Sequence, residues 1–129
     1  MSAICTGIKK SVTAEVTEEM LAVNVGSGGL RVLSTPSVAA LMERAAFELL
    51  EQYLPDGMTS VGTLISVRHF SASPFRSTIT AEAVLTAVDD RKYSFEITAS
   101  DNCGEIAKAE HERFAVKAER FMEKTNAKL

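Results

Sequence analysis

The fold of this chain is decided by one stretch, residues 35–54, which reads TPSVAALMERAAFELLEQYL. Its apolar residues recur at the spacing of an amphipathic α-helix. Thr35 suits the N-cap position, and Pro36 suits the first helical position, where a missing N–H breaks no hydrogen bond. The sequence Leu-Pro-Asp-Gly at 54–57 then ends the pattern. We therefore predict a helix of about five turns over residues 36–53.

One carboxylate interrupts the apolar side of this helix. At about 100° of rotation per residue, Glu43 falls among Ala39, Ala40, Phe47, Leu50 and Leu54, whereas Arg44, Glu48, Glu51 and Gln52 form a separate polar face. A buried carboxylate without partners is costly, so its pKa shifts or it gains hydrogen-bond donors. Either outcome is useful in catalysis. The structural alternative is that Glu43 pairs with a basic group at a dimer interface.

Beyond Gly57 the pattern alternates with a period of two, which is typical of strands. We predict a strand over residues 9–16 before the helix and four hairpin-linked strands after it, the last over 106–117. The predicted shared faces are Val61, Thr63, Ile65, Val67 and His69, then Ile79, Ala81, Ala83, Leu85 and Ala87, then Tyr93, Phe95, Ile97 and Ala99. This order predicts an α+β fold whose one long helix covers an antiparallel sheet. Free sheet edges favour a homodimer, and a tetramer remains possible.

The composition limits the classes of function that the chain can have. The 129 residues suit one domain, 1–129, with 46% hydrophobic and 24% charged residues and a net charge of -3. No net charge draws the whole molecule to nucleic acid or acidic membranes. The two cysteines, Cys5 and Cys103, lack metal-ligand spacing, so neither a metal nor a cofactor is expected. The N-terminus shows no signal-length apolar run, and we expect a cytoplasmic protein that does not enter a membrane.

Three polar residues form the candidate catalytic set. If the helix lies on the sheet, Glu43 and His69 point toward one another and can meet as an acid/base or nucleophile/base pair. Thr35 lies about 80° around the helix from Glu43 and roughly two turns away, where its hydroxyl either binds substrate or a carboxylate or only caps the helix. Arg113 is either a structural salt-bridge partner or a clamp for a phosphate or carboxylate.

The chain resembles the hotdog-fold acyl-CoA thioesterases, and within them the fluoroacetyl-CoA thioesterase-like group, over about residues 8–116. The motifs that carry the resemblance are Ser34-Thr35-Pro36, Glu43, Val61-Gly62-Thr63, His69 with Ala72-Ser73-Pro74, and His111-Glu112-Arg113. The resemblance implies an antiparallel sheet wrapped around one long central helix. It also implies a thioester hydrolase whose coenzyme A is part of the substrate.

The resemblance assigns roles residue by residue. It implies that Glu43 attacks the thioester carbonyl or activates water, that His69 acts as general acid/base, and that Thr35 positions the carboxylate or the substrate. Gly62 leaves room for the acyl group and donates its N–H to it, while Arg113 helps to hold the coenzyme A arm. Phe70, with Phe47 and Phe75, is expected to line a small acyl pocket.

The acyl group is less defined. The fluoroacetyl-CoA enzyme has aromatic residues that gate its acyl pocket, whereas residues 28–33 here read GGLRVL. We therefore expect a short or medium acyl-CoA, bound at the seam of a homodimer, with no implication of fluoroacetate resistance. The alternative on the same fold is a noncatalytic acyl-CoA binding or sensing module, and hydration of enoyl thioesters is a third reading.

Overall fold

The computed structural model describes residues 4–129, so residues 1–3 of the predicted domain lie outside it. Five antiparallel strands form one sheet in the order β1-β3-β4-β5-β2. In chain order, the elements are β1 (Lys9–Glu15), η1 (Glu18–Met20), α1 (Ala22–Val25), α2 (Thr35–Glu51), β2 (Met58–His69), β3 (Thr78–Asp89), β4 (Lys92–Asp101), β5 (Gly104–Lys117) and α3 (Ala118–Asn126).

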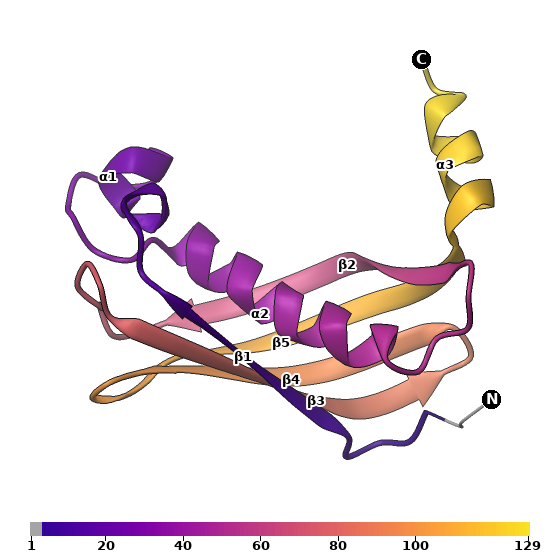
Figure 1. Cartoon of the computed structure of the whole chain (residues 1–129), viewed down its shortest axis with the longest axis horizontal. Coiled ribbons are helices and arrows are strands. Elements are labelled where there is room, and N and C mark those ends of the chain that lie inside the picture. The colour runs from indigo at the N-terminus through magenta and orange to yellow at the C-terminus, as the bar shows by residue number, and fades with distance from the viewer. Residues whose placement is uncertain (1–3) are drawn as a thin grey trace.

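The long helix α2 lies across the curved sheet, as Figure 1 shows. It buries a stripe formed by Val38, Leu41, Met42, Ala45, Ala46, Leu49 and Leu50. These side chains pack against inward-facing residues of the sheet such as Ile79, Leu85, Phe95 and Ile97. Burial of this apolar stripe is the main force that holds the helix on the sheet. The predicted α+β arrangement is confirmed, with a helix over 35–51 where we expected 36–53.

The start of α2 differs from the prediction by one residue. Ser34, rather than Thr35, is the N-cap, and its Oγ accepts a hydrogen bond from the backbone N–H of Ser37 at 3.2 Å. Two adjacent hydroxyl residues precede Pro36, so the sequence offered two candidate caps. Because Ser34 does the capping, the Thr35 hydroxyl is available for another partner.

The position of β2 in the sheet was predicted wrongly. We expected four strands linked by consecutive hairpins, but only β3, β4 and β5 follow one another in this way, and β2 pairs antiparallel with β5. Residues 70–77 carry the chain from β2 at one edge across to β3, which lies beside β1. Alternating periodicity indicates which side chains of a strand share a face, but it does not indicate which strands pair with one another. It therefore could not predict this crossover. As a result, β1 and β2 are the two edge strands.

A bulge in β2 changes which residues face α2. The register with β5 shifts between Gly62 and Leu64, so Thr63 is an extra residue. Gly62 lies opposite the buried Arg113, and Ile65 lies opposite the buried His111. The prediction that Val61 and Thr63 share a face with Ile65 is therefore wrong, because the extra residue reverses the alternation. The bulge instead places Gly62 on the face that lies under α2.

None of the helices within residues 4–129 combines the length and the apolar character needed to cross a membrane.

Candidate active site

The first residue of α2 and the last residue of β2 meet at one end of the helix. The Thr35 Oγ1 and the His69 Nδ1 are 2.7 Å apart, within hydrogen-bonding distance. Both residues line a pocket of about 300 Å³, together with Ser34 and Phe70. Phe70, expected to bind substrate, is 58% exposed and forms part of this rim. The expected partner of Thr35 was substrate or a carboxylate, whereas in the structure it is an imidazole.

The other nitrogen of His69 has no partner in the part of the chain that the structure describes. Nε2 is buried and makes no hydrogen bond with any residue in 4–129. If the Thr35 hydroxyl donates to Nδ1, the neutral ring carries its proton on Nε2, because each neutral imidazole has one donor and one acceptor nitrogen. A buried polar atom left unpaired costs free energy. In that tautomer, Nε2 is a buried N–H donor without a partner among the described residues.

Glu43 forms a second polar centre, beside Gly62. A Cβ added to Gly62 would lie 2.6 Å from Glu43 Oε2, which is closer than real Cβ contacts. The Glu43 side chain is 42% exposed in the protomer, so it lies at the margin of the buried stripe of α2 rather than within it. The expected burial in the apolar stripe is thus corrected, because the helix turns its Val38–Leu41–Ala45 side, and not its Glu43 side, toward the core.

A buried hydrogen-bond network supports this carboxylate. Arg113 donates from Nε to Ser60 Oγ at 2.8 Å and from Nη2 to the Ser60 carbonyl at 3.0 Å. Its Nη1 lies 3.9 Å from Glu43 Oε2 and 3.1 Å from His111 Nε2. The guanidinium also lies over the Phe47 ring, 5.7 Å from its centroid. Arg113 is therefore held on several sides and directs one positive edge toward Glu43.

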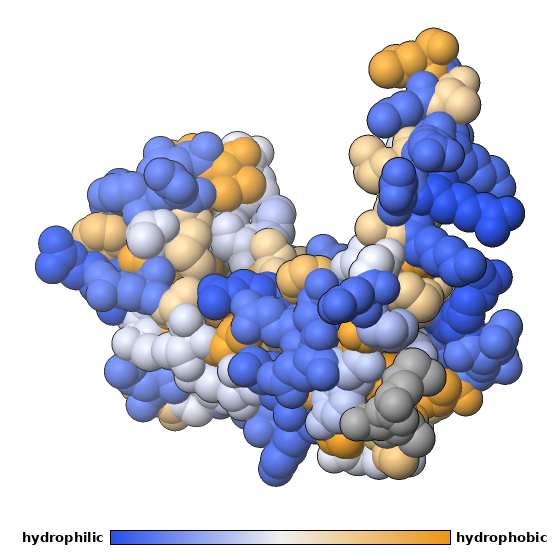
Figure 2. Space-filling view, turned by 45° about the vertical axis from the view of Figure 1, so that its right-hand side comes forward, coloured by the Kyte–Doolittle hydropathy of each residue, from blue (hydrophilic) through white to orange (hydrophobic). Residues whose placement is uncertain are grey.

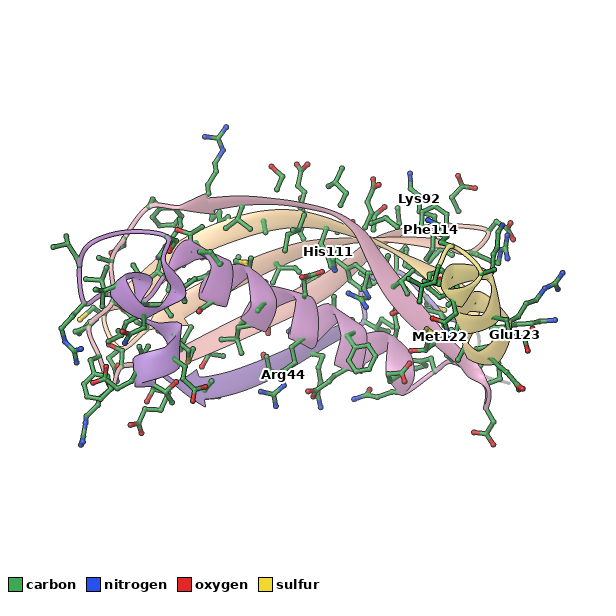
Figure 3. The ribbon with its side chains drawn as sticks, turned by 90° about the horizontal axis from the view of Figure 1, so that it is seen from above. Arg44, Lys92, His111, Phe114, Met122 and Glu123 are labelled. Carbon is green, nitrogen blue, oxygen red and sulfur yellow. The ribbon has the colours of Figure 1, made fainter. Side chains whose placement is uncertain are left out.

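His111 completes the network from β5. Its Nδ1 lies 2.7 Å from the Leu64 carbonyl, which can only accept, so Nδ1 donates and Nε2 is left to accept from Arg113 in the neutral ring. Burial lowers the pKa of His111, and the positive charge of Arg113 lowers it further. In Figure 3, His111 lies in the interior next to α2, whereas Arg44 of that helix points outward.

The position of Arg113 argues against the expected contact with coenzyme A phosphates. The residue is only 6% exposed, and its guanidinium is already engaged with Ser60 and His111. Burial lowers the pKa of Arg113, and the carboxylates of Glu43 and Glu51 oppose that shift. Its geometry suits the positioning of Glu43 far better than the capture of a ligand from solvent.

Within the single chain the two polar centres are separate. Thr35 and Glu43 are eight residues apart on α2, which corresponds to about 12 Å along the helix axis. Gly62 and His69 are separated by most of β2, roughly 20 Å at the rise of a strand. The described residues show no hydrogen bond or ion pair between Glu43 and His69. The structure thus pairs Thr35 with His69, and Glu43 with Gly62 and Arg113, but does not bring Glu43 to His69.

The sequence analysis missed two members of the network. Ser60 and the Leu64 carbonyl hold Arg113 and His111, and neither was a candidate. One available signal was Gly62 itself, because an isolated glycine inside a strand pattern often marks a bulge or a close approach. Reading it in that way would have placed Gly62, rather than Val61, beneath the helix.

Comparison with known proteins identifies the family. The model of a family described as fluoroacetyl-CoA-specific thioesterase matches residues 16–119. A fluoroacetyl-CoA thioesterase from Streptantibioticus cattleyicolor is 36% identical over 97 residues, which cover 75% of this chain and 70% of that protein. This chain belongs to the fluoroacetyl-CoA-specific thioesterase family. It is accordingly an enzyme of the thioester hydrolase class.

Solved structures agree with this membership. A structure of the fluoroacetyl-CoA thioesterase superposes with a TM-score of 0.92 at 28% identity, covering 99% of both chains. Another, of a variant of that enzyme in complex with acetyl-CoA, has a TM-score of 0.91 at 27% identity and covers 97% of this chain and 98% of that one. A hot-dog-like protein from Thermanaerovibrio acidaminovorans has a TM-score of 0.87 at 20% identity, covering 96% and 92% of the two chains, and supports the fold. The expected hotdog fold is confirmed.

Proposed function

We propose that this protein hydrolyses the thioester bond of a short or medium acyl-coenzyme A, using Thr35, Glu43 and His69. Water is consumed, the carbon–sulfur bond breaks, and the products are a carboxylic acid and the coenzyme A thiol. The observation that carries the proposal is the Thr35–His69 pair, which lines a pocket of about 300 Å³ and leaves the His69 Nε2 without a partner among residues 4–129. Family membership supports thioester hydrolysis as the reaction class.

In this proposal His69 is the general acid. In the protonated ring, Nδ1–H donates to the Thr35 hydroxyl oxygen, which fixes the ring orientation. The Nε2 proton then passes to the sulfur of the departing thiolate and leaves a neutral imidazole. Thr35 acts through His69 and is a positioning residue. The hydrogen bond that one imidazole nitrogen makes determines the protonation of the other, so a fixed Thr35 defines the state of Nε2.

Glu43 acts in one of two ways. As a nucleophile, its carboxylate bonds to the thioester carbonyl carbon, the thiolate leaves, and water then cleaves the resulting anhydride. As a general base, it removes a proton from a water molecule that attacks the same carbon directly. Both routes need a carboxylate held in a fixed place. Gly62 leaves the space for its Oε2, and the Nη1 of Arg113 draws it toward the sheet.

We place the complete site at the seam of a homodimer. β2 is an edge strand, so a second copy can pair with it antiparallel about a two-fold axis. Such pairing runs the Met58 end of one β2 beside the His69 end of the other, and so moves Glu43 toward the partner's Thr35 and His69. Apolar side chains next to Glu43 on α2, including Ala39, Ala40 and Phe47, are not fully buried in the protomer and suit this contact.

Mixing two inactive variants tests this arrangement. Glu43→Gln and His69→Ala should each lower kcat by about 100-fold or more, measured as thiol release from a panel of acyl-CoAs. When the two variants are mixed and allowed to exchange subunits, each mixed dimer contains one site with both native residues. Activity should then return to about a quarter of the wild-type value if exchange is random.

Several outcomes would contradict the proposal. Hydrolysis by Glu43→Gln at the wild-type rate would make the carboxylate structural. Absence of recovery on mixing, with exchange verified by a size tag, would place Glu43 and His69 of one chain in the same site. Tight binding of acyl-CoA by the wild-type protein without thiol release would identify a noncatalytic binding module.

A further inference from the structure

Four basic side chains surround a pocket where α3 leaves the sheet. The pocket measures about 390 Å³, and its lining residues are Met58, Arg91, Val116, Lys117, Arg120, Phe121 and Lys124. Four of these seven residues are cationic and none is acidic. Lys117 ends β5, Arg120 and Lys124 lie one turn apart on α3, and Arg91 occupies the turn between β3 and β4. Two segments of the chain, the turn at Arg91 and residues 117–124, thus contribute positive charge to one concave surface.

These cations form no ion pair within the part of the chain that the structure describes. All four are exposed, and no ion pair within residues 4–129 joins any of them to a carboxylate. Figure 1 shows α3 rising away from the sheet, and Figure 2 shows mainly hydrophilic side chains over it. Asp56, Glu119 and Glu123 line a neighbouring hollow together with Lys117 and Arg120. None of these carboxylates forms an ion pair with the four cations within residues 4–129, so the cations remain available to an anion.

The cluster lies within reach of the proposed chemistry. Met58 borders the pocket and precedes Gly62 by four residues on β2, which corresponds to about 13 Å along the strand. Glu43 Oε2 lies against Gly62. An extended pantetheine arm spans such a distance between a thioester and the phosphates of coenzyme A. The net charge of -3 repels that polyanion at long range, so a local positive cluster is needed to hold it.

We infer that Arg91, Lys117, Arg120 and Lys124 bind the phosphates of the 3′-phosphoadenosine diphosphate end of coenzyme A. This inference rests on the proposed function and names the surface that holds the part of the substrate remote from the reaction. Arginine and lysine side chains form charge-assisted hydrogen bonds with phosphate oxygens. Phe121, 38% exposed beside them, offers a ring face for the adenine base. Arg113, buried under α2, is not part of this surface.

Kinetics with full-length and truncated substrates test the inference. In the double variant Arg120→Glu with Lys124→Glu, we expect the KM for an accepted acyl-CoA to rise about tenfold or more, with kcat retained. The KM for the same acyl group on N-acetylcysteamine, which lacks the phosphates, should change by less than about twofold. The matched control is Lys9→Glu with Lys10→Glu, which makes the same change of net charge on β1 at the opposite edge of the sheet. It should leave the KM of both substrates near the wild-type value.

A binding measurement separates this inference from the proposed function. Adenosine 3′,5′-bisphosphate, titrated calorimetrically, should bind the wild-type protein and lose at least about tenfold in affinity in the Arg120/Lys124 variant. Inorganic phosphate at matched ionic strength should not compete with it, which excludes a general anion site. If the wild-type protein hydrolyses no thioester but the bisphosphate binds as described, the proposed reaction fails and the nucleotide surface stands.

Three results would overturn the inference. The first is an unchanged KM for acyl-CoA in the Arg120/Lys124 variant. The second is an equal rise of KM for both substrates, which would indicate a disturbed catalytic centre. The third is a change in molecular mass by light scattering in that variant alone, which would make the cluster a contact between subunits.

Discussion

At the scale of single residues, Gly62 fills a steric requirement of the Glu43 carboxylate. An added methyl group would lie 2.6 Å from Glu43 Oε2 and 3.2 Å from the Nη1 of Arg113. We expect Gly62→Ala to displace the carboxylate and to lower kcat at least about tenfold. The free energy of unfolding should fall by about 1–3 kcal/mol, because the same methyl group also lies 3.2 Å from the buried side chains of Arg113 and His111, which cannot move aside as the partly exposed Glu43 can.

The matched control for this prediction is Gly29→Ala. A Cβ added to Gly29 has no heavy atom within 4 Å, so the substitution meets no steric obstacle. It should leave the steady-state kinetics unchanged, while urea denaturation reports the stability of both variants. Full activity in Gly62→Ala would show that the position of Glu43 is not critical for turnover.

The neutral state of His111 predicts a pH dependence of stability. Burial lowers its pKa below the ordinary value of about 6.5, so the unfolded chain binds the proton more tightly than the folded protein. The resulting contribution to stability is present above about pH 6.5 and is lost as the pH falls through the folded pKa. Protonation would also turn Nε2 from an acceptor into a donor facing the Nη1 of Arg113.

Urea denaturation at pH 7.5, 6.0 and 5.0 measures this effect. Wild-type protein should lose more unfolding free energy between pH 7.5 and 5.0 than His111→Gln, which cannot titrate. The substitution itself should destabilise the protein at pH 7.5, because the Leu64 carbonyl and Arg113 lose well-placed partners. Parallel pH curves for the two proteins would refute the role assigned to His111.

At the scale of the elements, α2 begins with two adjacent hydroxyl residues that have different roles: Ser34 caps the helix, and Thr35 contacts His69. Ser34 is 1% exposed, and its Oγ accepts from the Ser37 N–H, so Ser34→Ala should cost about 1 kcal/mol of unfolding free energy. Thr35→Ala should change stability by less than about 0.5 kcal/mol but lower kcat about tenfold, because His69 loses its Nδ1 partner.

Thr35→Ser is the control for Thr35→Ala, because it should restore the turnover that Thr35→Ala loses. It keeps the hydroxyl that faces Nδ1 and should retain most of the turnover, measured by thiol release. Stability is read from thermal and urea unfolding in parallel. A large stability loss in Thr35→Ala with unaltered turnover would show that Thr35 caps the helix and that it does not contribute to catalysis.

Some properties of the strands depend only on their own sequence, whereas others depend on the rest of the sheet. The alternation of apolar residues correctly predicted the inward face of β4 and that of β3 as far as Leu85, because a side-chain period of two is a property of one strand. Ala87, which was expected on the same face as Leu85, is exposed, because the register of β3 with β4 shifts between Leu85 and Ala87. The bulge at Thr63 broke the same reasoning in β2, since an inserted residue reverses the faces that follow it. The edge position of β2 depends on the crossover through residues 70–77, which no local pattern specifies.

At the scale of the whole molecule, charge is distributed unevenly. The net charge of -3 would disfavour an anionic substrate, yet four cations gather around the pocket at the start of α3. The arrangement brings Arg91, in the turn between β3 and β4, to side chains from the end of β5 and from α3. Only the folded sheet makes one surface from segments that are widely separated in sequence, so net charge alone could not locate it.

The amino-acid sequence alone was sufficient to predict the long helix, the strand-rich second half, the family resemblance and the candidate residues Thr35, Glu43 and His69. These follow from periodicity and motif spacing, which are local properties of the chain. The tertiary structure decided which of them meet. Pairing of β2 with β5 and the bulge beside Gly62 placed Glu43 near Arg113. The start of α2 lies beside the end of β2, which places Thr35 within hydrogen-bonding distance of His69. Distances between segments depend on packing and register across the whole sheet, and these are fixed only when the chain folds.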